Sequence, residues 1–228
     1  MRFGLSARAK LDKVTIDNDL ISIILPVFNA QKTLQRAINS IIKQTYPVWE
    51  LIIVNDGSTD DSISIIKNIN DKRVKKIFLK KNKGLVYCLN LGVSLSKGIY
   101  VARMDADDIS LPERLFRQLQ FLKHNIIYDL VGSQLYVFDD DTKSIMDIHP
   151  KNEKKYLSKI YYFSYDIPHP TWMARTAWIK KYLYQEDNVY SEDQELLIRA
   201  SSKSNYFLIN EPLLLYSKNE IVLTDKLR

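Results

Sequence analysis

Two short and almost uninterrupted apolar runs limit the folds that this chain can adopt. Residues 21–26 read ISIILP and residues 50–55 read ELIIVN. A run without polar alternation is typical of a strand buried on both faces, and such strands belong to parallel sheets covered by helices. Each run is followed by apolar residues at helical spacing: Leu34, Ala37, Ile38, Ile41 and Ile42 after the first, and Ile63, Ile65, Ile66 and Ile69 after the second. The chain is therefore predicted to be an α/β protein.

The same alternation continues through the first half of the chain. Further strands are predicted at residues 74–79 and 99–104, with one helix opening at Gly84 and another over residues 115–122. Strands that alternate with helices indicate βαβ units and a mostly parallel central sheet flanked by helices. Ligands of such sheets bind beyond the carboxyl ends of the strands. Asp56 and the aspartates of residues 105–108 follow two of these ends, so we expect them at one edge of the sheet.

The second half of the chain has a less regular pattern. A longer strand is predicted at residues 130–138, followed by an acidic turn at residues 139–141. Residues 151–165 are charged and rich in tyrosine, and we interpret them as a helix and loop over the site. A strand at residues 169–174, a helix after Tyr190 and two short strands at residues 207–209 and 213–216 complete the prediction. We interpret this half as a smaller portion of the same domain.

Composition argues against several classes of protein. The 228 residues include 33 Lys and Arg against 27 Asp and Glu, which gives a net charge of +6. The densest basic run, within residues 72–83, is interpreted as a solvated surface, so nucleic acid is not a predicted partner. Cys88 is the single cysteine, which excludes an intrachain disulfide, and its apolar helical surroundings predict a core residue.

The sequence also bears on location. No apolar run approaches the ~20 residues that a membrane-spanning helix needs. Residues 1–13 lack the apolar centre of a secretory signal, and are interpreted as a frayed terminus or a weak membrane-touching segment. The predicted location is therefore the cytoplasm, either free or peripheral at the cytoplasmic face of the membrane.

The most chemically informative stretch is RMDADD at residues 103–108. Asp105, Asp107 and Asp108 follow an apolar strand, and like charges this close repel one another unless a cation or water separates them. Carboxylate oxygens suit hard divalent ions such as Mg²⁺ or Mn²⁺. A metal site and a solvated acidic turn before the next helix are both compatible with this stretch.

Five motifs occur in order along the chain. They are PVFN at residues 26–29, NDGSTD at 55–60, NKG at 82–84, RMDADD at 103–108 and the Glu192–Asp193 pair. Together they resemble glycosyltransferase family 2, the inverting nucleotide-sugar enzymes of GT-A fold, of the type that makes bacterial surface polysaccharides. The resemblance is strong over residues 21–117 and patchier over residues 169–199.

This resemblance implies a donor site in the first half. Asp56 would hydrogen-bond the nucleotide base, although a lone Asp-Gly-Ser is also typical of a helix N-cap or an Asx turn. Asp107 would bind Mn²⁺ or Mg²⁺ at the donor diphosphate, and Asp105 would touch ribose or assist the metal. The remaining implied donor-binding residues are Pro26, Phe28 and Asn29 as the pocket wall and Arg103, which would contact phosphate or form a surface ion pair.

The resemblance also implies an acceptor side in the second half. Asp193 would be the catalytic base, with Glu192 beside it. Two acidic residues in the first turn of a helix can also be purely structural, because negative charge is stabilised at a helix N-terminus. His169 and Trp172 would line the acceptor side, or would be packed in the core. The chain then divides into an N-terminal extension at residues 1–20, a nucleotide-sugar-binding portion at 21–138 and an acceptor-side portion at 139–228.

The predicted reaction is metal-dependent transfer of one sugar, with inversion, from a nucleotide-sugar to a glycan or lipid-linked acceptor. A UDP-sugar is the favoured donor. The Gln-x-x-Arg-Trp motif of processive synthases is absent, which favours a single transfer. Gln194 and Glu195 stand where relatives often have an aromatic residue and an aspartate, and many relatives continue beyond residues 216–218, so the acceptor pocket is the less defined part.

Three rival functions share parts of this pattern. A sugar nucleotidyltransferase would share the sheet and the carboxylates, but its Gly-rich, basic first loop is missing from residues 26–30. A catalytically inactive nucleotide- or carbohydrate-binding module of the same fold would differ only in turnover. A dinucleotide dehydrogenase is disfavoured because no Gly-x-Gly-x-x-Gly follows the first strand.

Overall fold

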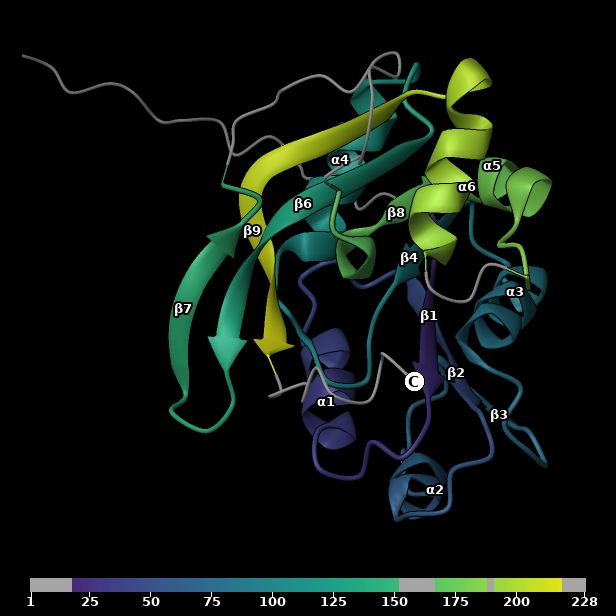
Figure 1. Cartoon of the computed structure of the whole chain (residues 1–228), viewed down its shortest axis with the longest axis vertical. Coiled ribbons are helices and arrows are strands. Elements are labelled where there is room, and N and C mark those ends of the chain that lie inside the picture. The colour runs from purple at the N-terminus through teal and green to yellow at the C-terminus, as the bar shows by residue number, and fades with distance from the viewer. Residues whose placement is uncertain (1–17, 152–166, 188–190, 219–228) are drawn as a thin grey trace, which may run out of the picture.

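The computed structural model describes residues 18–151, 167–187 and 191–218. Within these residues the fold is a nine-stranded sheet with helices on both faces (Figure 1). The strand order is β3 (Val74–Phe78), β2 (Trp49–Asn55), β1 (Ile21–Val27), β4 (Tyr100–Arg103), β8 (Met173–Arg175), β6 (Leu130–Asp139), β9 (Tyr206–Lys218) and β5 (Ile109–Ser110), and β7 (Ser144–His149) pairs with β6. The predicted α/β class and flanking helices are therefore present.

The first four strands of this order are parallel. Ile21 of β1 is in register with Trp49 of β2 on one side and with Tyr100 of β4 on the other. The register with β4 ends at Ile24, before Pro26, whose missing N–H would weaken a fully paired central strand. Because these strands are parallel, the residues that follow β1, β2 and β4 meet at one edge, as predicted.

The two faces of β1 pack against different helices. Ile23 and Leu25 face a core with α1 (Leu34–Ile42), α2 (Ser62–Lys67) and α4 (Arg114–His124). Ile24 faces a second core with α3 (Leu85–Leu95), α5 (Thr176–Tyr182) and α6 (Glu192–Ala200). A Cβ added at Gly92 of α3 would lie 2.4 Å from Ile24, so this glycine allows the helix to approach the sheet closely. The continuous apolar character of β1 thus reflects burial on both sides.

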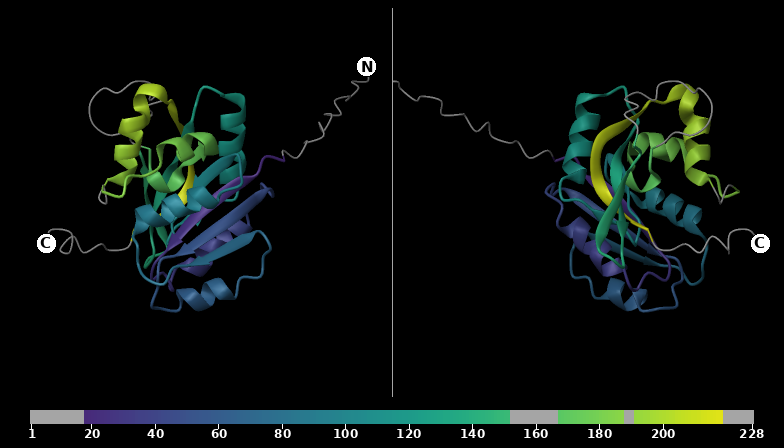
Figure 2. Two further views of the ribbon diagram at one scale, coloured as in Figure 1. Left: turned by 90° about the vertical axis from the view of Figure 1, so that its right-hand side faces the viewer. Right: turned by 60° about the vertical axis from the view of Figure 1, so that its left-hand side comes forward.

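The other side of the sheet is mixed. β8 is antiparallel to both β4 and β6, β9 is parallel to β6, and β5 and β7 are antiparallel to their partners. β9 curves alongside β6 for most of its length (Figure 2). The mostly parallel arrangement predicted for the sheet therefore describes β3, β2, β1 and β4, together with the β6–β9 pair.

Two predicted elements differ from the structure. The expected strand at residues 169–174 is a 3₁₀ helix, η1 (His169–Thr171), followed by the short strand β8. Pro168 and Pro170 lack the N–H of a sheet ladder, and the Thr171 hydroxyl donates to the Pro168 carbonyl at 2.7 Å, which favours the turn. The two expected closing strands are one continuous strand, β9, with a register shift near Pro212. A further 3₁₀ helix, η2 (Ser201–Lys203), precedes β9.

Two predicted segments lie largely outside the described residues. They are residues 1–17 of the N-terminal extension and residues 152–166 of the expected helix and loop. The short stretch before β1 is described, and the Tyr46 hydroxyl donates to the Asp19 carbonyl at 2.7 Å.

Candidate active site

The loops that follow β1 and β2 are joined by hydrogen bonds. Asn29 adopts a left-handed backbone conformation, with φ of 49°, and its side-chain oxygen accepts from the Thr59 amide at 2.8 Å. The Asn29 amide in turn donates to the Ser58 hydroxyl at 3.0 Å. This reciprocal pairing fixes the loop that carries Phe28, which is 49% exposed. Pro26 lies within β1, in register with Val54 of β2. An exposed aromatic ring on a fixed loop is suited to walling a pocket.

Asp56 is buried at the end of β2 and closes a second loop. Its two carboxylate oxygens accept from the amides of Lys83 at 2.7 Å and Gly84 at 2.9 Å. Helix α2 begins only at Ser62, so Asp56 is not its N-cap. Each carboxylate oxygen has two lone pairs, so both oxygens can still accept a donor from a ligand.

The aspartate turn, defined as Asp105, Asp107 and Asp108, follows β4. Its carboxylates each place one oxygen within 4.8 Å of the others. Asp108 is fully buried, and one of its oxygens accepts from the Ser217 amide of β9 at 3.0 Å. Its other oxygen is buried without a hydrogen-bond partner among the described residues. Such a set of crowded oxygens fits Mn²⁺ or Mg²⁺.

The electrostatics of the aspartate turn support the same interpretation. Burial, followed by the charges of Asp105 and Asp107, raises the pKa of Asp108 well above its usual value. Burial and Asp105 also raise the pKa of Asp107. A cation among these carboxylates would offset the repulsion that raises both values.

Arg103 lies beside the aspartate turn. Its guanidinium pairs with Asp105 at 2.6 Å, and its side chain is only 9% exposed. The Asp105 side chain is 24% exposed, so the ion pair is partly buried, and contact of Arg103 with a phosphate stays a prediction.

Two buried polar side chains of α4 hold the end of β4, just before the aspartate turn, and the 3₁₀ helix η1. The Arg114 side chain is 1% exposed and donates to the Arg103 carbonyl at 2.7 Å. Gln118, one turn later, donates to the Thr171 carbonyl of η1 at 2.6 Å. Burial lowers the pKa of Arg114 to about 10. Sequence reasoning missed both residues, although a charged and an amide side chain on the apolar face of a helix are a readable signal.

The acceptor-side residues form a second polar group. One ring nitrogen of His169 lies 2.8 Å from the Tyr184 hydroxyl, and the other lies 3.5 Å from a carboxylate oxygen of Glu192. Burial, reinforced by the positive charge of Arg103, lowers the pKa of His169 well below its usual value. Burial raises the pKa of Tyr184. Glu192 is 9% exposed at the start of α6, whereas the adjacent Asp193 is more accessible.

The two polar groups lie close enough to interact. The charges of Arg103, Asp105 and Asp193 all act on His169. The structure therefore brings the end of β4 and the start of α6 together, as predicted. Tyr184 was missed because nothing in its local sequence separates it from the many other tyrosines of this chain.

Trp172 is not placed as predicted. Its side chain is 3% exposed, it belongs to the core that contains α3, α5 and α6, and its indole N–H donates to the Ile167 carbonyl at 3.0 Å. It contacts the His169 ring edge-on, with the ring centroids 4.5 Å apart. Trp172 thus supports His169 from the core and has no face free for a sugar.

Cys88 is also buried, which confirms its prediction as a core residue.

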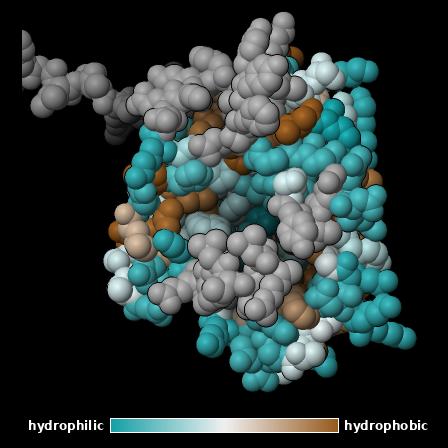
Figure 3. Space-filling view, viewed as in Figure 1, coloured by the Kyte–Doolittle hydropathy of each residue, from teal (hydrophilic) through white to brown (hydrophobic). Residues whose placement is uncertain are grey.

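The space-filling view is consistent with a site at this edge. Figure 3 shows that this face of the molecule is hollowed near its middle and that hydrophilic residues lie in the hollow.

Comparison with known proteins decides the family. The model of "Glycosyl transferase family 2" matches residues 22–183 of the 228. The chain belongs to glycosyltransferase family 2. This match confirms the predicted family and enzyme class.

Several known proteins are similar in sequence to this chain. An uncharacterized glycosyltransferase of Methanocaldococcus jannaschii is 32% identical over 88% of this chain and 71% of its own length. The O-antigen biosynthesis glycosyltransferase WbnJ of Escherichia coli is 33% identical over 79% of this chain and 71% of its own length. The match to the putative glycosyltransferase EpsE of Bacillus subtilis is 41% identical but covers 44% of that protein. This chain therefore spans less than half of EpsE.

Solved structures confirm the predicted GT-A-like fold. TarS of S. aureus superposes with a TM-score of 0.70 at 23% identity, covering 87% of this chain and 60% of that one. The mannosyltransferase PcManGT of Pyrobaculum calidifontis gives a TM-score of 0.64 at 16% identity, covering 87% of this chain and 56% of that one.

Among the described residues, no helix has both the length and the apolar character needed to cross a membrane.

Proposed function

We propose that this chain transfers one sugar from a nucleotide-sugar, with a UDP-sugar favoured, to a glycan or lipid-linked acceptor in surface polysaccharide synthesis. The observation that carries the proposal is the single sheet edge that gathers Asp56, the aspartate turn and the Glu192–Asp193 pair. An acceptor carried on lipid would bring the protein to the cytoplasmic face of the membrane as a peripheral partner.

The names of related proteins support both proposed substrates, the nucleotide-sugar donor and the lipid-linked acceptor. TarS has been solved with UDP and with UDP-GlcNAc, and PcManGT with GDP-Man and Mn²⁺. WfgD of E. coli, named as a UDP-Glc:α-D-GlcNAc-diphosphoundecaprenol glucosyltransferase, is 34% identical over 52% of this chain. A nucleotide-sugar donor and a lipid-linked acceptor are therefore in keeping with this family, and the choice of base is left to experiment.

The donor would bind across the two carboxylate groups at this edge. Asp56 keeps acceptor capacity for the N–H of a base, and Phe28 offers an exposed ring on the loop that follows the neighbouring strand β1. Asp107 and Asp105, with Asp108 behind them, would hold a divalent cation against the donor diphosphate. The bound cation would neutralise the negative charge that develops on the departing nucleoside diphosphate.

The chemical step requires a base on the acceptor side. In our mechanism Asp193 takes the proton of the acceptor hydroxyl, whose oxygen attacks the anomeric carbon as the bond to the diphosphate breaks. One in-line displacement inverts the configuration and uses no enzyme nucleophile. A carboxylate oxygen of Glu192 lies 3.5 Å from His169, whose other ring nitrogen lies 2.8 Å from the Tyr184 hydroxyl, so the start of α6 lies against these buried side chains.

The first test is calorimetric titration with UDP, GDP and CDP, in Mn²⁺ and in EDTA. The proposal expects metal-dependent binding of one nucleotide, and a panel of sugars on that nucleotide would then identify the donor from nucleotide release. Pyrophosphate release from a nucleoside triphosphate and a sugar phosphate would favour the nucleotidyltransferase instead. Binding without any turnover would favour the inactive module.

The second test is Asp193→Asn. Loss of a general base should lower the transfer rate by about 10²–10⁴-fold, while nucleotide binding persists. Glu195→Gln is the matched control, because Glu195 lies on the same helix but pairs with Arg199 at 2.5 Å. Undiminished transfer by Asp193→Asn would show that this residue is not the base.

A further inference from the structure

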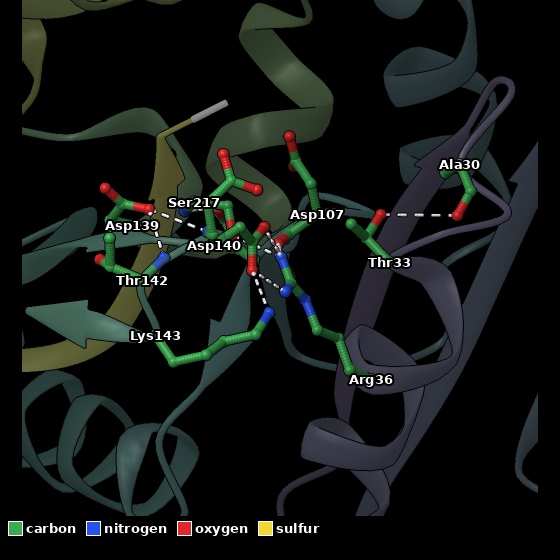
Figure 4. A network of polar contacts seen from close by, with 11 residues as sticks. Ala30, Thr33, Arg36, Asp107, Asp139, Asp140, Thr142, Lys143 and Ser217 are labelled. Atoms are coloured by element: carbon green, nitrogen blue, oxygen red, sulfur yellow. Dashed lines mark hydrogen bonds and ion pairs between the residues drawn. The ribbon is translucent and has the colours of Figure 1, made fainter. Parts of the chain in front are cut away.

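Arg36 of α1 connects segments that lie far apart in the sequence. Its guanidinium pairs with both carboxylate oxygens of Asp140, donates to the Asp107 carbonyl at 2.7 Å and donates to the Ser217 hydroxyl at 2.5 Å (Figure 4). Asp107 belongs to the aspartate turn, Asp140 to the β6–β7 hairpin and Ser217 to β9. One side chain thus joins the aspartate turn to two strands of the mixed part of the sheet.

The hairpin is built to present Asp140. The neighbouring Asp139 carboxylate accepts from the amides of Asp141 at 2.8 Å and Thr142 at 3.0 Å, and Lys143 completes the turn with φ of 54°. The hydrogen bond from Arg36 lowers the pKa of Asp140 to about 2. The Arg36 and Asp140 side chains are only 25% and 16% exposed, so this ion pair is partly shielded from solvent.

The contact to Asp107 is made to its backbone. Figure 4 shows the Asp107 carboxylate directed away from the guanidinium, while its carbonyl faces Arg36. The next residue, Asp108, is held by the Ser217 amide at 3.0 Å. The turn is therefore held at consecutive residues, by α1 at the Asp107 carbonyl and by β9 at the Asp108 carboxylate. Without those contacts, repulsion among the three carboxylates would favour a turn that swings apart.

We propose that Arg36, oriented by Asp140, is a positioning residue that holds the Asp107 carboxylate ready for the divalent cation. This inference rests on the proposed function, since it needs Asp107 to be a metal ligand. Arg36 touches neither donor nor acceptor in this scheme. It acts through the Asp107 carbonyl, because a site whose ligands are already in place loses less entropy on binding than one that must first be ordered.

The test is UDP titration of Arg36→Gln and Asp140→Asn, in a series of Mn²⁺ concentrations and in EDTA. We expect each variant to need at least about 10-fold more Mn²⁺ for half-maximal UDP binding, the scale on which groups supporting a metal ligand act. Binding in EDTA, which depends on Asp56 and its loops, should match the wild type. The double variant should be no worse than Arg36→Gln alone, because the two residues act as one unit.

Arg117→Gln is the matched control. It removes an arginine that pairs with Glu211 at 3.0 Å on a more exposed part of the surface, so its Mn²⁺ requirement should equal that of the wild type. Asp140→Asn keeps the shape of the side chain and carries the test if Arg36→Gln does not fold.

Three results would overturn the proposal. They are an unchanged Mn²⁺ requirement in both variants, an equal rise in Arg117→Gln, and a loss of UDP binding in EDTA as large as that in Mn²⁺. The last would mean that the whole site collapses and that Arg36 is merely structural. UDP binding by the wild type that ignores Mn²⁺ would instead overturn the proposed metal-dependent function itself.

Discussion

Asp56 and the aspartate turn follow strands on either side of β1, yet the protein holds their carboxylates in opposite ways. Both oxygens of Asp56 accept backbone amides from the loop before α3. In the aspartate turn the carboxylates face one another, and one buried oxygen of Asp108 has no partner among the described residues. Both oxygens of the Asp56 carboxylate are hydrogen-bonded by the chain, whereas, in the part of the chain that the structure describes, the three carboxylates of the aspartate turn share one ion pair, that of Asp105 with Arg103.

This difference teaches what each site needs from solution. The Asp56 loop is closed by hydrogen bonds without a ligand, so its shape is set in the free protein. Arg103 offsets only part of the repulsion among the carboxylates of the aspartate turn, so under the proposed function a bound cation would add stability there. Substitutions at the two places should therefore move stability in opposite directions.

The largest effect is expected for Asp107→Asn. Removing this charge should lower Mn²⁺-dependent UDP binding at least about 100-fold, since the metal loses a ligand. Stability without metal should be unchanged or higher, because a like charge is gone. Wild-type protein should gain about 2.7 kcal/mol when Mn²⁺ is 100 times its Kd, and at the same Mn²⁺ concentration a variant that binds about 100-fold more weakly should gain no more than about 0.4 kcal/mol. Calorimetry and thermal unfolding in Mn²⁺ and in EDTA measure both quantities. A variant that unfolds more easily in EDTA would contradict the comparison.

A smaller effect, on stability, is expected for Asp56→Asn. The asparagine keeps one acceptor but turns an NH₂ group toward a backbone N–H, so one amide of Lys83 or Gly84 loses its partner. A buried donor without a partner costs about 1–3 kcal/mol, which urea unfolding in EDTA would detect. Asp61→Asn, on an exposed part of the same loop, is the control. Equal stability of the two variants would show that the Asp56 loop does not depend on its carboxylate.

The smallest effect is expected for His169. This buried side chain avoids a charge in the folded protein by losing its proton. Its folded-state pKa lies well below the usual 6.5, so below that pH the unfolded chain takes up a proton that the folded protein does not. Lowering the pH from about 7.5 to about 5.5 should therefore remove about 1.4 kcal/mol of stability through this residue. The His169→Gln variant should lose about 1.4 kcal/mol less stability than the wild type over the same change of pH. Urea unfolding of both proteins at the two pH values measures it, and identical losses would show that His169 is protonated in the folded state.

The parallel half of the fold could be predicted from the sequence because its signals are local. The apolar runs at residues 21–26 and 50–55 predict strands, and the aspartates that follow strands must meet at one edge of a parallel sheet. The positions of Asp105 and Asp107 at this edge follow from that rule and from the sequence alone.

The mixed half could not be predicted as well, because its contacts are long-range. Nothing in the sequence near Arg36 indicates Asp140, which lies 104 residues away. Tyr184, whose hydroxyl contacts His169, is held through its backbone by Asn90 of α3, 94 residues away. Trp172 was assigned to the acceptor side by its neighbourhood in the sequence, whereas burial decides its role. Two closing strands were predicted at residues 207–209 and 213–216, but they form one strand, β9, with a register shift near Pro212.

The contact between Ser217 and the aspartate turn also has a consequence for the order of assembly during synthesis. The Asp108 carboxylate emerges from the ribosome 109 residues before the amide that holds it, and Arg36 emerges 181 residues before the Ser217 hydroxyl. The parallel strands can pair while the chain is still being made, since their partners are near in sequence. The aspartate turn reaches its final form only after β9 has been added. We therefore expect nascent chains to acquire metal affinity late, after the Asp56 loop has formed.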